Sequence, residues 1–177
     1  GPSRSIMAFA EAHDLPVLIH SAVDPADTWS QAFDCLDVAA AHPRVRFAFA
    51  HSLRFDLPAL EAARELDNVW VDCSAHLLHC ELALLDAPAV ASRDRRVPAD
   101  YESPVDAMTA VHEILRGRYV WGSDSPYQSW SDDDFSSVHA YSEEAAVLHA
   151  LSEDVRDSML VSAPEAWLFG SPSDSAA

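Results

Sequence analysis

A short pattern that decides the fold first appears at residues 15–20, where the sequence reads LPVLIH, an apolar run that stops at a polar side chain. The pattern returns at 45–51 (VRFAFAH), at 69–74 (VWVDCS) and at 118–124 (RYVWGSD). Apolar runs of this length, bounded by polar residues, are typical of strands that are buried on both faces of a parallel sheet. The sequence therefore predicts four buried, parallel strands.

Segments with helical spacing of apolar residues lie around and between these strands. We expect helices over 5–13, 25–41, 57–66, 77–85, 104–116, 131–151 and 153–168, with Asp24 capping the second of them. Alternation of strands and helices predicts an α/β fold of βαβ units with right-handed crossovers. The chain has only four glycines and no glycine-rich phosphate loop, which disfavours an open nucleotide-binding sheet.

The length of the chain limits how much of a barrel it can form. A complete TIM (β/α)8 barrel usually takes roughly 250 residues, whereas this chain has 177. Four βα units would make half a barrel, and an open-sheet α/β protein stays as the alternative. Four strands would leave two open edges and an uncovered apolar inner face, so we expect the chain to associate with a partner.

Two segments depart from the alternating pattern. Residues 86–103 contain prolines and a cluster of charged side chains, which predicts a long, mobile loop that acts as a lid over the barrel mouth. The small, polar residues 171–177 predict a disordered tail after a single α/β domain over 1–170.

Composition narrows the classes of function. The net charge of −18 leaves no basic footprint for nucleic acid, and no apolar run approaches the ~20 residues that a membrane helix needs. The three cysteines, Cys35, Cys73 and Cys80, are an odd number without a regular framework. Free thiols of this kind are typical of a reducing cytoplasm, where we expect the protein to act without nucleic-acid or membrane partners.

Residues that can carry chemistry follow three of the predicted strands. His20, His51 and Asp124 each stand where an apolar run stops. Because function in parallel α/β folds gathers at the carboxyl ends of strands, we expect these three side chains to lie close together. Imidazoles and a carboxylate are suitable zinc ligands and proton-transfer groups, although each residue taken singly is more often structural.

Other polar residues beside these strand ends are weaker candidates. Cys73, His76, His79 and Cys80 offer a cramped zinc site, but a strand end that runs into a helix is the favoured interpretation. Asp72, Cys73 and Ser74 follow the third strand and are candidates to line a pocket. Ser52 and Arg54 are candidates to contact an anionic substrate, with a loop arginine paired with surface carboxylates as the alternative. Tyr127 and Trp130 are candidates to wall the pocket, but aromatic packing on the barrel rim is the favoured interpretation.

Three stretches, LPVLIHSA (15–22), FAFAHS (47–52) and VWGSDSPY (120–127), resemble the fifth, sixth and eighth strand ends of the amidohydrolase superfamily. The likeness is to the C-terminal half of the barrel in the amidohydrolase-2 branch, which contains metal-dependent decarboxylases and lactone hydrolases. The resemblance implies that His20 is a ligand of a divalent metal, with zinc as the expected ion. It also implies that His51 orients water or substrate, or binds a second metal, and that Asp124 contacts the metal and moves the proton of the attacking water.

The resemblance has a consequence for the isolated chain. The first-strand His-x-His pair of the family does not occur in this sequence, so His20 and Asp124 would leave the metal two ligands short of the usual three or four, and the chain alone is expected to be inactive. Its partners would be a small organic substrate and either the missing N-terminal half barrel or a second copy of the chain. The alternatives are a non-catalytic half barrel that associates with itself and an open-sheet protein.

Overall fold

The structure is a computed structural model that describes residues 2–125 and 139–170. Its centre is one sheet of four parallel strands in the order β1-β2-β3-β4: β1 (Val17–Ile19), β2 (Phe47–Phe49), β3 (Val69–Asp72) and β4 (Tyr119–Val120). The predicted α/β fold with four parallel strands is therefore confirmed. Each strand is shorter than the run that predicted it, and His20, His51, Ser74 and Asp124 lie beyond the carboxyl ends of the strands.

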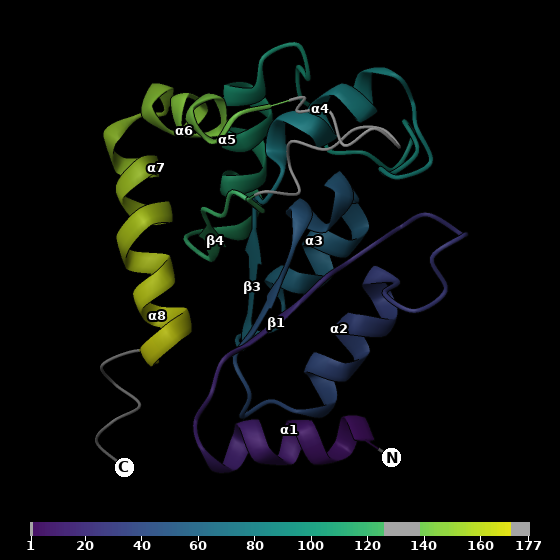
Figure 1. The fold of residues 1–177 in the computed structure, drawn as a ribbon, viewed down its shortest axis with the longest axis vertical. Helices are drawn as coiled ribbons and strands as arrows, with labels where there is room; N and C mark the ends of the chain where they lie inside the picture. The colour runs from purple at the N-terminus through teal and green to yellow at the C-terminus, as the bar shows by residue number, and fades with distance from the viewer. Residues whose placement is uncertain (1, 126–138, 171–177) are drawn as a thin grey trace.

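Helices flank the sheet (Figure 1). They are α1 (Pro2–Ala12), α2 (Ala32–Ala41), η1 (His51–Phe55), α3 (Leu57–Arg64), α4 (His76–Leu84), α5 (Pro104–Leu115), α6 (Tyr141–Ala150), α7 (Glu153–Asp157), η3 (Ser158–Ser162) and α8 (Ala163–Phe169). The helix expected over 153–168 is present as a continuous run with one π-helical turn, η3, in its middle. The first part of the helix expected over 131–151, and the tail 171–177, lie outside the described residues.

The prediction that a helix begins at residue 25 was wrong, since α2 begins at Ala32. Residues 24–31 form turns instead. Asp24 accepts a hydrogen bond from the backbone of Ala26 (2.8 Å), and Asp27 accepts one from the backbone of Trp29 (3.0 Å). Aspartate side chains compete in this way with the helical hydrogen bonds of the backbone, and here the turns are favoured over helix.

The main core lies between one face of the sheet and helices α2, α3 and α5. Phe47, Phe49 and Tyr119 point from the strands into this core and are fully buried. The residues that alternate with them, Ala48 and Trp70 among others, point to the opposite face. The sheet therefore has one face on the helical layer and one face on the side that a closed barrel would enclose.

The inner face is not left uncovered, which corrects our expectation. Helix α8 packs on it, with Ala163, Ala166 and Trp167 contacting a small apolar cluster on the strands. In Figure 1, α7 and α8 stand beside β4, on the side away from α2 and α3. The β1 side of the sheet stays open, and Leu18 there is 58% exposed.

Residues 86–103 contain no helix or strand, as expected, but they are firmly anchored rather than loose. Ala91 and Val97 donate backbone hydrogen bonds to Arg54 and Phe55 (both 2.9 Å), and Arg95 pairs with the carboxylate of Asp56 at 2.7 Å. The segment therefore buttresses η1, which argues against the predicted mobility. Within the described residues, no helix is both long and apolar enough to cross a membrane.

Candidate active site

The structure brings two of the predicted residues into direct contact at the carboxyl ends of the strands. His20 follows β1 and His51 follows β2, and their Nδ1 and Nε2 atoms are 3.0 Å apart. The two rings meet edge to face, with centroids 4.8 Å apart. Asp124 follows β4 at the same end of the sheet, near enough to Asp72 and Arg54 for their charges to shift its pKa.

His51 and Arg54 are presented by an unusual backbone segment. All five residues of η1 have positive φ, from 47° to 66°, and none is glycine. Left-handed backbone costs about 1–2 kcal/mol for each such residue, so the surrounding structure must hold it. The backbone N–H of His51 donates to Asp72 (3.2 Å), and Ser52 shares a 2.5 Å hydrogen bond with Tyr119. Strain of this kind is typical of functional sites.

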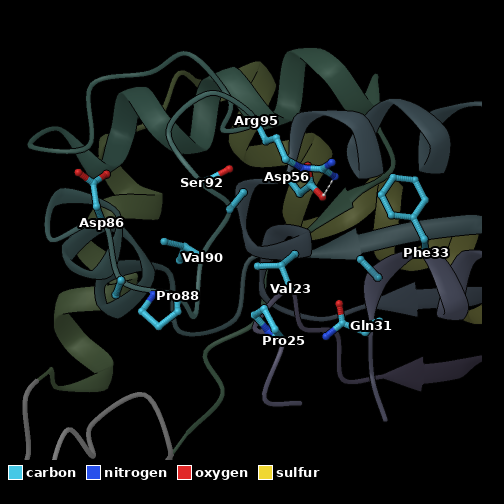
Figure 2. A pocket seen from close by; sticks show the side chains of 13 residues that line it. Val23, Pro25, Gln31, Phe33, Asp56, Asp86, Pro88, Val90, Ser92 and Arg95 are labelled. Carbon is cyan, nitrogen blue, oxygen red and sulfur yellow. Dashed lines mark hydrogen bonds and ion pairs between the residues drawn. The ribbon is translucent and has the colours of Figure 1, made fainter. Parts of the chain in front are cut away.

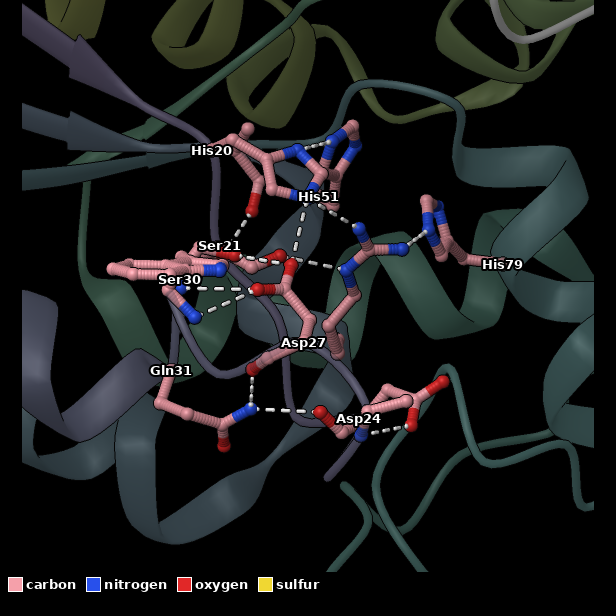
Figure 3. A network of polar contacts seen from close by, with 12 residues as sticks. His20, Ser21, Asp24, Asp27, Ser30, Gln31, His51 and His79 are labelled. Atoms are coloured by element: carbon pink, nitrogen blue, oxygen red, sulfur yellow. Dashed lines mark hydrogen bonds and ion pairs between the residues drawn. The ribbon is translucent and has the colours of Figure 1, made fainter.

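Arg54 contacts the imidazoles of His20 and His79, which are labelled in Figure 3. Its Nη2 is 3.3 Å from Nε2 of His20, its Nη1 contacts Nε2 of His79, and its Nε donates to the carbonyl of Ser21 at 2.8 Å. These described contacts are with imidazole nitrogens and a carbonyl, so none of them neutralises the guanidinium. Burial lowers the pKa of Arg54 to about 10, which leaves it a cation at neutral pH.

The hydrogen-bond partners fix which nitrogen of each ring carries a proton. Nδ1 of His51 faces the carbonyl of Ser74 (3.1 Å), and Nδ1 of His79 faces the carbonyl of Ala75 (2.7 Å). Carbonyls only accept, so both protons sit on Nδ1 and both Nε2 atoms are acceptors. Nε2 of His51 can then accept a hydrogen bond from Nδ1 of His20, and Nε2 of His20 in turn accepts one from Arg54.

Electrostatics keep these rings neutral. Burial first, and then the charge of Arg54, lowers the pKa of His51 to about 3 and the pKa of His79 well below its usual value. The same two causes lower the pKa of the more exposed His20, against a smaller opposing effect of Asp27. Neutral imidazole is the form that binds metals and accepts protons.

Asp72 is the buried carboxylate that organises the site, and sequence reasoning named it only as a pocket-lining residue. Besides the N–H of His51, it accepts the N–H of Ser74 at 2.8 Å. Burial raises the pKa of Asp72, and burial together with the nearby Asp72 charge raises the pKa of Asp124. The charge of Asp72 therefore acts on Asp124 at this edge of the sheet.

Several candidates turn out to have other partners. His79 belongs to the Arg54 cluster, and Nε2 of His76 lies 3.5 Å from Sγ of Cys80 and 2.8 Å from the carbonyl of Pro104. Among the described residues, these side chains and Cys73 are not arranged as the cramped zinc site. Burial raises the pKa of both thiols, which keeps them protonated. The hydroxyl of Ser52, a predicted contact of an anionic substrate, is buried against Tyr119. The hydroxyl of Ser74 lies 3.0 Å from Nδ1 of His51 and so helps to orient that ring, while Tyr127 and Trp130 lie outside the described residues.

The donor set fits part of a metal site. His20, His51 and Asp124 are a neutral imidazole pair and a half-buried carboxylate at one edge, which are suitable ligands for zinc. Within residues 2–125 and 139–170, however, no group of three His, Cys, Asp or Glu side chains is arranged to hold an ion. The residues present therefore match a fraction of a coordination shell.

A separate cavity of about 420 Å³ lies beside this cluster, between the turns after β1 and residues 86–95 (Figure 2). Arg95 lines it, paired with Asp56 and positioned 5.9 Å from the centroid of the Phe33 ring. The cavity is lined by none of His20, His51 and Asp124, so the chemistry-bearing cluster and this hollow are different places.

Comparisons with known proteins agree with this architecture. A family model described as an amidohydrolase matches residues 1–170. Among solved structures, the chain is similar to a zinc-bound amidohydrolase from Burkholderia multivorans, with 15% identity, a TM-score of 0.57, and coverage of 91% of this chain and 55% of that one. It is also similar to an Agrobacterium tumefaciens protein, with 22% identity, a TM-score of 0.55, and coverage of 94% and 54%.

A third similar structure is a 5-carboxyvanillate decarboxylase from Sphingomonas paucimobilis, with 15% identity, a TM-score of 0.54, and coverage of 92% and 52%. No curated protein matches the chain significantly in sequence. The chain spans about half the length of the solved structures that it matches, and its four parallel strands correspond to half of their barrel. The predicted half-barrel fold is confirmed.

Proposed function

The chain belongs to the amidohydrolase family, and on that premise we propose that it supplies half of the active site of a metal-dependent hydrolase or decarboxylase. The substrate would be a small organic molecule, and the remaining metal ligands would come from outside this chain. The observation that carries the proposal is the neutral His20–His51 pair, in contact at 3.0 Å, at the same strand ends as Asp124.

Each residue has a role that follows from its surroundings. A bound divalent ion would supply Lewis acidity and make water a stronger acid, and His20 and Asp124 are the residues that would hold it. Asp124, whose pKa is raised by burial, accepts a proton more readily at neutral pH than an exposed aspartate does, as a general base must. His51, oriented by Ser74 and Asp72, directs its unprotonated Nε2 towards His20.

Arg54 is the residue that we assign to an anionic group of the substrate. Arg54 is a partly buried cation, and none of the contacts described above is with a carboxylate. Those contacts use three of its five N–H groups, so two N–H groups remain to donate hydrogen bonds to a ligand. A carboxylate is the ligand that a guanidinium binds best, by two parallel hydrogen bonds. Ser74 and Tyr127 are weaker proposed substrate contacts, Ser74 because it follows β3 and Tyr127 because it follows Asp124 in the sequence.

Removing the charge of Arg54 is expected to change the titration of His20 in the isolated chain. In the Arg54→Gln variant the pKa of His20 rises toward its ordinary value, because a neighbouring cation no longer disfavours the imidazolium. Titration of the His20 ring protons by NMR measures this directly. The Arg93→Gln variant is the control, since Arg93 pairs with the exposed Asp86. An unchanged His20 titration in Arg54→Gln would contradict the described contact.

The isolated chain is expected to bind zinc weakly. Two ligating residues leave most of the coordination shell to water, so the preorganised part of the affinity is lost. Calorimetric titration should give zinc binding that is millimolar or weaker. The His20→Ala variant should weaken this binding further. The His13→Ala variant, which replaces an exposed residue after α1, should leave the binding unchanged. A stoichiometric ion that survives a chelator wash would show that other residues of this chain complete the site, and would count against a half-site.

A further inference from the structure

The helical run α7–η3–α8 (Glu153–Phe169), called here the C-terminal cover, lies against the outer edge of β4. Backbone N–H groups in and directly after β3 donate hydrogen bonds to the carbonyls of Arg118 and Val120. The backbone groups of the alternating residues, Tyr119 and Trp121, therefore point to the other side of β4, where no strand of the described chain is paired. Trp121 uses its outward N–H to donate to the carbonyl of Met159 at 3.2 Å. The cover therefore satisfies a group that would bond to the next strand of a closed barrel.

The same segment covers the inner face of the sheet. Ala163, Ala166 and Trp167 pack on Ala48, Trp70 and Val120, which alternate with the core residues of the strands. Arg46 ties the end of the helix down through bonds to the carbonyls of Trp167 (2.7 Å) and Leu168 (3.2 Å). In a complete barrel these positions would meet side chains from other strands.

This packing is imperfect in a specific way. The indole N–H groups of Trp70 and Trp167 are both buried, and neither finds a hydrogen-bond partner within the described part of the chain. A buried donor without a partner costs about 1–3 kcal/mol. The outer side of the cover also carries apolar residues, including Val161 at 49% and Phe169 at 78% exposed. The contact between the cover and the sheet thus leaves two buried donors unpaired within the described residues, and the cover keeps apolar side chains exposed.

We propose that the C-terminal cover detaches as a unit, and that the surface it releases pairs with the β1 edge of a second copy of the chain. Two observations favour this occupant. The β1 edge is open, with Leu18 58% exposed, and the sheet holds four strands of an eight-stranded architecture. A two-fold axis along the barrel would place β1 of the partner parallel to β4, and two such contacts would close both edges. The proposal requires no metal and no activity, so its test is separate from that of the proposed function.

Hydrogen exchange of the full chain tests the detachment. The Trp121 amide is expected to exchange at least about tenfold faster than the Val71 amide, whose bond to Arg118 lies inside the sheet. In the Trp167→Ala variant, exchange of the Trp121 amide should be faster by a further tenfold or more, and exchange of the Val71 amide should be unchanged. Phe169→Ala, on the exposed side of the same helix, should alter neither amide.

Sedimentation tests the occupant. Trp167→Ala is expected to form dimers at micromolar concentrations at which the unmodified chain and Phe169→Ala are monomers. If Trp167→Ala fails to fold, Ala163→Gly, which weakens the same contact less, should give a smaller shift in the same direction. Equal acceleration of Trp121 and Val71 would overturn the detachment, because the cover would then open only with the whole fold. A variant that releases the cover and stays monomeric would overturn pairing with a second copy.

Discussion

Replacing Asp124 by asparagine in a completed barrel is expected to lower kcat about 10²- to 10⁴-fold, the range that a positioned acid–base group contributes. The amide keeps the shape of the side chain but cannot accept a proton, and it is a poor ligand for a divalent cation. Because the Asp124→Asn variant would also bind the metal less tightly, its metal content must be measured together with its rate.

The matched control is Asp37→Asn, an exposed carboxylate on α2. Its kcat and metal content should equal those of the unmodified chain. If Asp124→Asn kept more than about a tenth of the activity with a full complement of metal, Asp124 would not be the proton acceptor, and Asp72 would become the leading candidate at this edge.

Acidification from pH 7.5 to 5.5 is expected to destabilise the fold. The pKa is lowered by burial to about 3 for His51 and to about 4 for His76, so both rings stay neutral in the fold and gain protons in the unfolded chain below about pH 6.5. Unfolding then takes up protons, and stability falls as the pH falls toward those folded pKa values, by on the order of 1 kcal/mol per pH unit for each ring.

Buried carboxyl groups oppose this trend, among them Asp72 and Asp124, whose raised pKa values act in the same sense as that of Glu144. Burial raises the pKa of Glu144 to about 7, so the fold binds a proton there before the unfolded chain does and gains stability as the pH falls from 7. The net loss for the unmodified chain should be about 1–3 kcal/mol, measured by urea unfolding at the two pH values. Glu144→Gln should make the loss larger and His51→Asn should make it smaller. A stability that rises between pH 7.5 and 5.5 would contradict the neutral, buried imidazoles.

The strand ends could be predicted because the rule behind them is simple. In a parallel sheet all carboxyl ends lie at one edge, so His20 and His51 had to be neighbours once both were placed after strands. The positions of Asp72 and Ser74 follow from the same rule. These residues needed only the pattern of apolar runs, which the sequence displays four times.

Other features depend on contacts that no local pattern reports. The left-handed backbone of η1 contains no glycine to signal it, and it exists because Asp72, Tyr119 and the segment 86–103 hold it. His79 reaches Arg54 from a helix that follows a different strand. The covering of the inner face by α8 likewise depends on packing between residues that are far apart in the chain, such as Trp70 and Trp167.

Joining this chain to a polypeptide that supplies four further strands and a first-strand His-x-His pair tests the half-site most directly. Metal content and turnover are measured for each part alone and for the purified complex. We expect the complex to retain about one equivalent of divalent metal through dialysis and to hydrolyse or decarboxylate a small carboxylate-bearing substrate, with His20→Ala in this chain abolishing both. A stable complex that takes up no metal, or a chain that is fully active alone, would contradict the account.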